Sequence, residues 1–313
     1  MPIQLSSSRA IADRRAFLAA SLVAAGYHTL LADDAKLTDD AKVEADRFAL
    51  LADTHIAADP QLESRGVKMT ALLASTVKQL LERERRCAAA FVFGDCAYLD
   101  GQPGDYRQLA KLLQPLGEQQ WTIHLALGNH DHRARCMEAF PAGDGPLVAK
   151  LERRVEVVQG KQANWFLLDS LDQVNSTPGK LGTTQLEWLA EELDRHADRP
   201  ALIGVHHNPV SATLPSPGKV AGLVDTADLF KVIDGRRFVK AVFFGHTHAW
   251  SVLEHAGIHL VNLPPVAYAF TKDKPNGWVD CLLSEDRAEL TMHCHDAARP
   301  EHNRPLELKW RKG

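Results

Sequence analysis

Short apolar runs alternate along this chain with segments of helical periodicity, and each run stops at a polar residue or at a glycine. The first half contains three such runs, at 47–52, 88–93 and 121–127, separated by amphipathic stretches at 67–86 and 106–116. Short apolar runs between amphipathic helices are typical of strands that are buried in a largely parallel sheet. The alternation therefore predicts an α/β fold.

The second half continues this pattern and then becomes richer in strands. Apolar runs at 165–168, 201–205 and 238–244 surround a predicted helix at 184–196. We predict that four further segments are antiparallel strands: 250–254, 258–263, 278–283 and 289–295. No break in composition separates two cores, so we predict one domain over residues 47–296.

The N-terminal segment differs in character from the rest. Arg14 and Arg15 stand directly before a short apolar run at 16–25, which is shorter than the roughly 20 apolar residues that a membrane span requires. Two adjacent arginines before such a run resemble a twin-arginine export signal, although an ordinary amphipathic helix is the alternative. We therefore predict that residues 1–32 are an export signal and that the protein is periplasmic or exported without a stable membrane span. Without a signal it would be cytoplasmic.

Charge and cysteine content exclude several classes of protein. The 313 residues carry a formal net charge of −4 at pH 7, which argues against specific nucleic-acid binding. Five cysteines without a C-x-x-C pair indicate neither a disulfide framework nor a zinc ribbon. We predict that residues 33–46 are a linker and that residues 297–313 are a polar tail exposed to solvent. Nothing in the sequence indicates the oligomeric state.

Metal-capable side chains are concentrated directly after the apolar runs. In α/β sheets, residues at the carboxyl ends of the strands face the ligand crevice. An extended backbone would also direct Asp53 and His55, and likewise His246 and His248, to the same side. The candidate metal ligands are Asp53, His55, Asp95, Asn129, His206, His246 and His248.

The chemistry of this set favours divalent ions. Carboxylate and imidazole groups without a thiolate suit Mn, Fe or Zn. Seven donors exceed the needs of one tetrahedral zinc and suit two ions that keep open positions, with Asp95 as the natural bridge. Two ions about 3.5–4 Å apart polarise a phosphoryl oxygen and supply metal-bound hydroxide at neutral pH. The set thus predicts a dinuclear metal-dependent hydrolase that acts on a small phosphoester.

Five sequence blocks, taken in order, resemble the calcineurin-like metallophosphoesterase family. They are D-T-H at 53–55, G-D at 94–95, G-N-H-D at 128–131, H-H at 206–207 and G-H-T-H at 245–248. The resemblance implies a four-layer α/β/β/α sandwich in which two mixed sheets are flanked by helices. It further implies a phosphodiesterase or a phosphomonoesterase, with cyclic-nucleotide phosphodiesterases among the nearest branches.

The resemblance also implies a role for each site residue. One metal ion would be held by Asp53, His55, Asp95 and His248. The other would be held by Asp95, Asn129, His206 and His246. His130 resembles the acid of the family that acts on the phosphoryl group or the leaving oxygen, and Asp131 would orient it.

Two alternatives stay open at this point. Tyr98, at the end of the block G-D-C-A-Y, occupies the position of the iron-ligating tyrosine of purple acid phosphatases, although that family has glycine where His55 stands. The second alternative is an exported binding module that keeps the fold without catalysis. The resemblance also implies that loops select the substrate, and we expect these to be 60–65, 102–105 and 211–219, whose Gly-, Pro- and Ser-rich sequences carry little readable chemistry.

Overall fold

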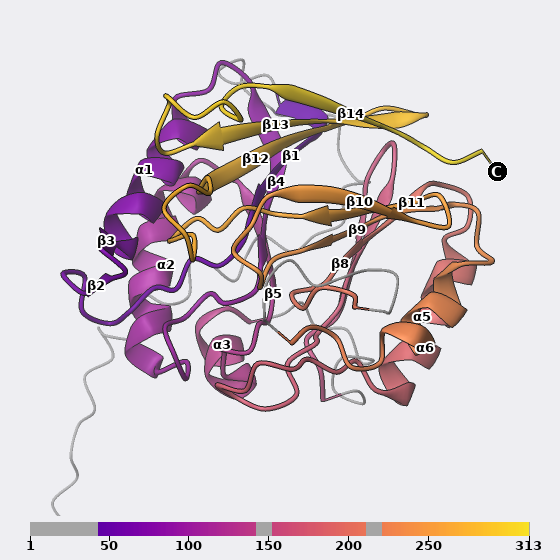
Figure 1. The fold of residues 1–313 in the computed structure, drawn as a ribbon, viewed down its shortest axis with the longest axis horizontal. Helices are drawn as coiled ribbons and strands as arrows, with labels where there is room; N and C mark the ends of the chain where they lie inside the picture. Colours follow the sequence, from indigo (N-terminus) through magenta and orange to yellow (C-terminus); the bar gives the residue numbers. More distant parts are fainter. Residues whose placement is uncertain (1–42, 142–151, 211–220, 313) are drawn as a thin grey trace, which may run out of the picture. The chain divides into compact units, whose positions relative to one another are not determined.

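Two six-stranded sheets pack face to face in the computed structural model, which describes residues 43–141, 152–210 and 221–312 (Figure 1). The first sheet has the order β14-β13-β12-β1-β4-β5. Its strands are β14 (Pro305–Lys309), β13 (Arg287–Cys294), β12 (Gly277–Leu283), β1 (Val43–Leu51), β4 (Arg86–Phe93) and β5 (Thr122–Ala126). β1, β4 and β5 are parallel, whereas β12 to β14 are antiparallel, so the sheet is mixed.

The second sheet has the order β10-β11-β9-β8-β7-β6 and is also mixed. Its strands are β10 (Ser251–His255), β11 (Ile258–Asn262), β9 (Val239–Phe244), β8 (Ala201–Gly204), β7 (Asn164–Leu167) and β6 (Glu156–Gln159). The four central strands are parallel, and the two edge strands, β10 and β6, pair antiparallel to them.

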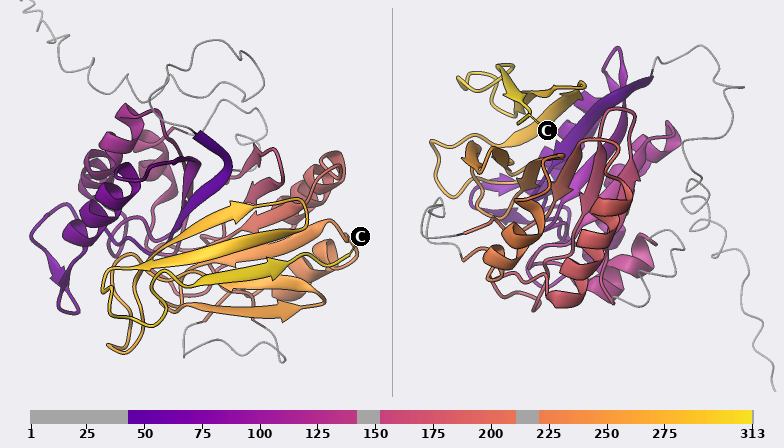
Figure 2. Two further views of the ribbon diagram at one scale, coloured as in Figure 1. Left: turned by 90° about the horizontal axis from the view of Figure 1, so that it is seen from above. Right: turned by 90° about the vertical axis from the view of Figure 1, so that its right-hand side faces the viewer.

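Helices cover the outer face of each sheet (Figure 2). The first sheet is covered by α1 (Met69–Leu81) and α2 (Pro103–Glu118), and the second by α5 (Thr183–Arg195) and α6 (Thr226–Ile233). The short helix α3 (Arg133–Ala139) contacts α2, and a small hairpin of β2 (Glu63–Ser64) and β3 (Val67–Lys68) precedes α1. The predicted α/β/β/α sandwich is confirmed. None of the helices among the described residues combines the length and apolarity that crossing a membrane would take.

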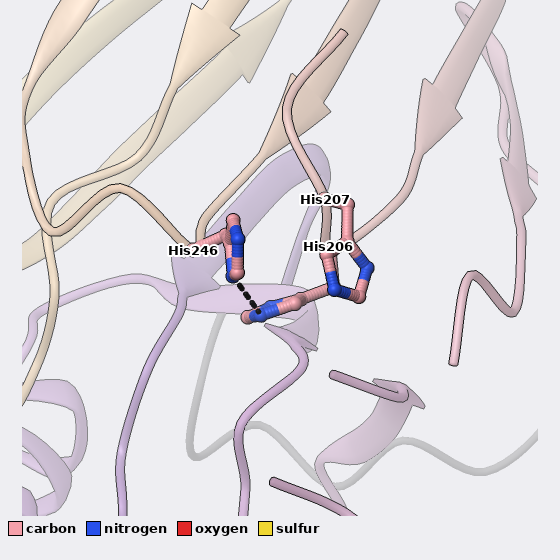
Figure 3. A group of neighbouring side chains, drawn as sticks. All are labelled: His206, His207 and His246. Atoms are coloured by element: carbon pink, nitrogen blue, oxygen red, sulfur yellow. Dashed lines mark hydrogen bonds between the residues drawn. The ribbon is translucent and has the colours of Figure 1, made fainter. Parts of the chain in front are cut away.

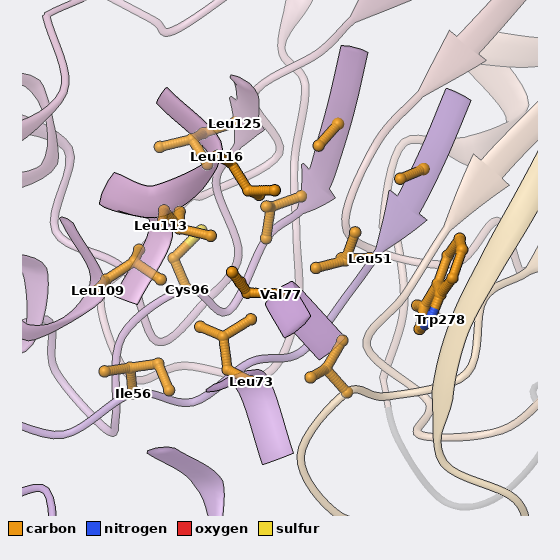
Figure 4. Packing of buried hydrophobic residues seen from close by; sticks show 14 of the residues in the cluster. Leu51, Ile56, Leu73, Val77, Cys96, Leu109, Leu113, Leu116, Leu125 and Trp278 are labelled. Atoms are coloured by element: carbon orange, nitrogen blue, oxygen red, sulfur yellow. The ribbon is translucent and has the colours of Figure 1, made fainter. Parts of the chain in front are cut away.

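Strand periodicity divides the buried side chains among separate cores. In β1, Phe48 and Leu50 point to the core between the sheets, whereas Ala49 and Leu51 point to the core under α1 and α2. Figure 4 shows this outer core, where Leu73 of α1 and leucines of α2 surround side chains from the first sheet. Because each central strand is apolar on both faces, both sheets are covered on both sides.

Several boundaries differ from the predictions made from sequence. The prediction of a tail is wrong for 305–309, because this segment pairs with β13 as strand β14, although Leu308 is its one buried side chain. β1 begins at Val43, inside the predicted linker, while residues 33–42 lie outside the described part of the chain. The sequence analysis did not identify β6, α3 or α6. These elements are short, so they provide few periods of a pattern.

The residues after β14 connect the two sheets through Arg311. Its guanidinium donates hydrogen bonds to the carbonyl oxygens of Arg236 at 2.7 Å, Val239 at 3.0 Å and Ala256 at 2.9 Å. In return, the Nζ of Lys240 donates to the carbonyl oxygen of Arg311 at 2.8 Å. The strand that closes the first sheet is thereby fastened to the end of α6 and to the second sheet.

We expect Arg311→Ala to lower the free energy of unfolding by about 2 kcal/mol, because hydrogen bonds from a charged donor contribute about 1.5–3 kcal/mol. The matched control is Lys309→Ala, because the side chain of Lys309 is 80% exposed and should contribute about 0.5 kcal/mol or less. Urea denaturation followed by circular dichroism measures both. Equal midpoints for the two variants would show that this connection does not stabilise the fold.

Candidate metal centre

The loops that follow β1, β4, β5, β8 and β9 meet where these strands end, and backbone hydrogen bonds tie several of them together. His55 N donates to the carbonyl oxygen of Asp95 at 2.9 Å, and Ile56 N donates to that of Cys96 at 3.0 Å. On the other sheet, Gly245 N donates to the carbonyl oxygen of His206 at 3.1 Å. The pairing of the strands thus continues into the loops and fixes the backbone beneath the site.

Most of the predicted ligands adopt a left-handed backbone conformation. The φ angles are 52° at Asp53, 46° at His55, 47° at Asp95, 69° at His246 and 52° at His248. The sequence analysis predicted that Asp53 and His55, and likewise His246 and His248, share a face because the chain is extended there. This prediction is wrong, because the left-handed backbone at each residue sets the direction of its side chain. Such conformations cost about 1–2 kcal/mol each in residues other than glycine and are concentrated at functional sites.

The first group of ligand atoms belongs to Asp53, His55, Asp95 and His248. One ligand atom from each lies within 4.8 Å of the others, and all four side chains are buried. His248 Nε2 lies 3.0 Å from His55 Nε2 and 3.5 Å from an oxygen of Asp53, and His55 Nε2 lies 3.8 Å from an oxygen of Asp95. His248 Nδ1 donates to the carbonyl oxygen of Tyr268, so its Nε2 presents a lone pair to the group.

The second group contains His206 and His246, which Figure 3 shows with His207. His206 Nδ1 donates to the carbonyl oxygen of Phe93 at 2.8 Å, and His246 Nε2 donates to that of Ala221 at 2.9 Å. The remaining nitrogens, His206 Nε2 and His246 Nδ1, lie 3.2 Å apart (Figure 3, dashed line). Two lone pairs at this distance repel each other unless a proton or a cation lies between them.

Asn129 and His207 complete the surroundings of the second group. Within the described part of the chain, the side-chain oxygen of Asn129 is buried without a hydrogen-bond partner. A bound cation would give this oxygen its missing partner. The sequence analysis assigned His206 rather than His207 as a ligand. The structure also brings His207 into the group, with its Nδ1 2.7 Å from the hydroxyl of Ser170. This hydroxyl holds the His207 ring against that of His246, at 4.5 Å between centroids.

The protonation of the site suits cation binding. Burial lowers the pKa of His246 to about 3 and that of His248 to about 4, so both rings are neutral donors at pH 7. Burial also works to lower the pKa of His206, but Asp95 raises it to about 9. Burial alone would raise the pKa of Asp95, whereas the nearby His206 holds it well below its usual range. Without metal, a proton on His206 thus balances the charge of Asp95, and a divalent ion would replace that proton.

The predicted role of Asp131 as the group that orients His130 is wrong. The Asp131 carboxylate is fully buried and accepts hydrogen bonds from the backbone N–H groups of Cys96, Ala97 and Gly128 at 2.9–3.1 Å. It therefore holds together the loops that carry Asp95 and Asn129. The side chain of His130 is oriented by the carbonyl oxygen of Leu99, which lies 2.6 Å from Nδ1 and leaves Nε2 for the pocket.

A pocket of about 340 Å³ opens above these groups. Its lining includes His55, Asp95, Asn129, His246 and His248 from the two groups of ligands. The outer wall consists of Ser64, Arg65, Tyr98, Leu99, His130, Thr177, Tyr268 and Phe270. Of the predicted substrate loops, 60–65 thus reaches the pocket, 102–105 contributes no lining residue, and 211–219 lies outside the described residues. The pocket has the size and depth to hold a small ester against the metal ligands.

Comparison with known proteins agrees with this geometry. The profile of the calcineurin-like phosphoesterase family matches residues 46–250. A 3′,5′-cyclic-nucleotide phosphodiesterase of Nostoc sp. is 28% identical over 71% of this chain and 79% of its own length. A cAMP/cGMP dual specificity phosphodiesterase of Mycobacterium tuberculosis is 31% identical over 63% of this chain and 60% of its own.

Solved structures share the fold at low identity. A dimetal phosphatase from Danio rerio covers 85% of this chain and 99% of its own with a TM-score of 0.67 at 17% identity. The purple acid phosphatase PPD1 from yellow lupin covers 86% of this chain and 54% of its own with a TM-score of 0.59 at 14% identity. The chain belongs to the calcineurin-like phosphoesterase family, and the protein is a metal-dependent phosphoester hydrolase.

We expect Gly128→Ala to abolish metal binding in a folded protein. A Cβ at this position would lie 2.2 Å from a carboxylate oxygen of Asp95, 2.4 Å from its backbone nitrogen and 2.7 Å from His206 Nε2, so both residues would have to move. The matched control is Gly117→Ala, where a Cβ meets nothing within 4 Å and should leave the metal content unchanged. Elemental analysis of both purified variants measures the bound metal, and full occupancy in Gly128→Ala would contradict the proposed packing.

Proposed function

We propose that the protein hydrolyses 3′,5′-cyclic nucleotides to nucleoside monophosphates with a pair of Mn, Fe or Zn ions. The observation that carries this proposal is a pocket of about 340 Å³ with carboxylate, amide and imidazole donors at its floor and aromatic side chains at its mouth. A phosphodiester at the floor would leave its organic part against the aromatic wall. The activities named for the Nostoc and Mycobacterium relatives are consistent with this substrate class.

The metal set follows from the donors. Bound divalent ions would polarise the phosphoryl oxygens and lower the pKa of a water molecule, which is the chemistry the reaction needs. Asp53, His55, Asp95 and His248 are the proposed ligands of one ion. Asp95, Asn129, His206 and His246 are the proposed ligands of the other. The absence of a thiolate from this set favours Mn, Fe or Zn over softer ions.

His130 is the proposed proton donor. Cleavage of a phosphorus–oxygen ester bond leaves an alkoxide that must be protonated. An imidazolium whose Nδ1–H is held by a carbonyl can donate its Nε2 proton to this alkoxide. The hydrogen bond from Nδ1 to Leu99 fixes the ring, while its edge contacts His55 at 5.3 Å between centroids. His130 thus lies beside the ligands without belonging to the groups they form.

A second candidate is a purple-acid-phosphatase-like enzyme in which Tyr98 ligates ferric iron. It is favoured by the position of Tyr98 in the pocket lining, three residues after Asp95. A tyrosinate–iron bond would colour the oxidised protein violet. A colourless protein that contains stoichiometric iron would therefore exclude this candidate and leave His55 as the ligand.

We also propose that residues 1–32, which lie outside the described residues, direct export. The support is the sequence pattern of Arg14 and Arg15 followed by the apolar run 16–25. A fusion of residues 1–46 to a reporter that is active only outside the cytoplasm tests this proposal. Activity that disappears when both arginines are replaced by lysine supports twin-arginine export, and an inactive fusion rejects it.

We expect His130→Ala to keep its metal and to lose about 10²–10⁴-fold in kcat, because proton donation to the leaving group contributes about this factor. The measurement combines elemental analysis with turnover of a phosphodiester. The loss should shrink when the leaving alcohol is replaced by p-nitrophenol, which departs without a proton. An equal loss with both leaving groups would assign His130 another role.

A substrate panel tests the activity itself. The Mn²⁺-loaded protein should hydrolyse 3′,5′-cyclic AMP or 3′,5′-cyclic GMP with a higher kcat/KM than p-nitrophenyl phosphate. Asp95→Asn is the inactive control, because it removes the charge that both proposed ions share. Hydrolysis of the monoester alone, by protein that contains metal, would refute the cyclic-nucleotide proposal and leave the family assignment intact.

A further inference from the structure

Beyond the metal ligands, the mouth of the pocket is formed by a cation and two exposed apolar side chains. We call Arg65, Leu99 and Phe270, which all line the pocket, the rim. Phe270 is 42% exposed and Leu99 is 47% exposed, which makes them two of the larger exposed hydrophobic residues among those described. A single exposed apolar residue is ordinary, but two at one pocket mouth indicate a surface that an apolar ligand covers.

Arg65 is held in place by a tight turn. It lies with Gly66 at the tip of the β2–β3 hairpin, where Ser64 pairs with Val67 and only these two residues form the turn. Both have positive φ angles, 51° at Arg65 and 81° at Gly66, as a two-residue turn of this kind requires. The hairpin therefore presents Arg65 in a defined position and does not leave it on an irregular loop.

Aromatic rings pack against the Arg65 guanidinium. Its Cζ lies 5.0 Å from the centre of the Phe270 ring and 5.5 Å from that of the Tyr268 ring, within the range of a cation–π contact. Among the described residues, no carboxylate or carbonyl group accepts a hydrogen bond from this guanidinium. Its donors are thus left for a group that enters the pocket, and Arg65 is the one lysine or arginine among the described lining residues.

The rim lies one layer of side chains outside the metal ligands. Phe270 stacks on His248, with 4.2 Å between ring centroids and 12° between planes, and Tyr268 stacks on His55 at 5.1 Å. Arg65 contacts Phe270 and Tyr268, so it touches the rings that support the ligands and is not part of the ligand groups. A phosphoryl group at the floor is thus held apart from Arg65, which is placed for the far end of the substrate.

Leu99 contributes a further exposed apolar side chain to the mouth. Its φ angle of 55° is unusual for a branched side chain, and its carbonyl oxygen is engaged by His130 at 2.6 Å. The leucine side chain therefore projects from a constrained backbone. The mouth combines two apolar surfaces with a planar fork of N–H donors, which is the chemistry that recognises a flat ring with acceptors along its edge.

We propose that the rim is a subsite for the purine base of the substrate, in which Arg65 donates hydrogen bonds to acceptors at the edge of the base. On its Hoogsteen edge, guanine offers two adjacent acceptors, N7 and O6, which match a guanidinium fork, whereas the same edge of adenine offers N7 beside the N6 amino donor. The subsite therefore favours guanine. This inference rests on the proposed cyclic-nucleotide activity, since a substrate without a base would leave the rim empty.

The test compares Arg65→Met with wild type on 3′,5′-cyclic GMP, 3′,5′-cyclic AMP and bis-p-nitrophenyl phosphate. The ratio of kcat/KM for cyclic GMP to that for bis-p-nitrophenyl phosphate should fall roughly fivefold or more, since a bidentate contact accounts for at least about that much discrimination. The preference for cyclic GMP over cyclic AMP should shrink as well. Arg65→Lys should behave like Arg65→Met, because lysine keeps the charge but loses the fork.

Lys68→Met is the matched control. Lys68 lies on the same hairpin and contacts Gln61 outside the pocket, and its substitution removes the same charge. The ratio of kcat/KM for cyclic GMP to that for bis-p-nitrophenyl phosphate should therefore stay at the wild-type value. Equal losses of Arg65→Met on all three substrates would place Arg65 at the phosphoryl group and overturn the base subsite. Wild-type kcat/KM values of Arg65→Met on all three substrates would overturn the base subsite as well.

A binding measurement separates the subsite from the proposed activity. Calorimetric titration of the metal-loaded protein with GMP should give a Kd that rises roughly tenfold in Arg65→Met, with a smaller change for ribose 5-phosphate. If wild type cleaves bis-p-nitrophenyl phosphate but no cyclic nucleotide, the proposed function fails, and the GMP titration still decides the subsite. Equal affinities of wild type and Arg65→Met for GMP reject it.

Discussion

The attraction between Asp95 and His206 is the interaction on which the centre of this molecule depends. Both side chains are buried, and His206 Nε2 lies 3.3 Å from a carboxylate oxygen of Asp95. An isolated charge at this depth would be very unfavourable, so each group stabilises the ionised form of the other. Asp95 follows a strand of the first sheet and His206 a strand of the second, so the same pair joins the two halves of the sandwich beneath the pocket.

Around this pair, hydrogen bonds between loops hold an energetically unfavourable backbone conformation in place. Left-handed backbone at five neighbouring ligands would relax if the loops were free. The loops are not free, since backbone pairing extends past the strand ends and Asp131 gathers the amides of Cys96, Ala97 and Gly128. The two sheets thus fix the positions of the candidate ligand side chains, which would otherwise separate. The site is therefore preorganised for cation binding.

Much of this arrangement could be predicted from sequence because it depends on local pattern. Apolar runs ending at Asp53, Asp95 and His206 mark both the strands and the positions of the ligands, and parallel pairing then brings their ends together. The details that depend on contacts between distant residues could not be predicted. The extended backbone predicted at His55 is wrong, because the residue type alone does not reveal the left-handed φ angle that this histidine adopts. The role of Asp131 was misjudged because its partners, backbone amides in the loops after β4 and β5, have no side-chain signature.

The same limit applies at the edges of the fold. β14 has mostly exposed side chains, and only Leu308 faces inward, so its sequence is typical of a tail although its backbone closes a sheet. The sequence indicated the loop 60–65 as substrate-selecting but did not single out Arg65, because the rings beside it, Tyr268 and Phe270, follow about two hundred residues later. The structure of a short edge strand and the role of a single charged residue depend on contacts with distant residues, which sequence periodicity does not reveal.

Leu99 joins two tasks in a single residue. Its side chain forms part of the pocket mouth, while its carbonyl oxygen orients the imidazole of His130, the proposed proton donor. A ligand that presses on the leucine would displace the same peptide unit that orients this histidine. A substitution at this position would therefore change selectivity and rate together.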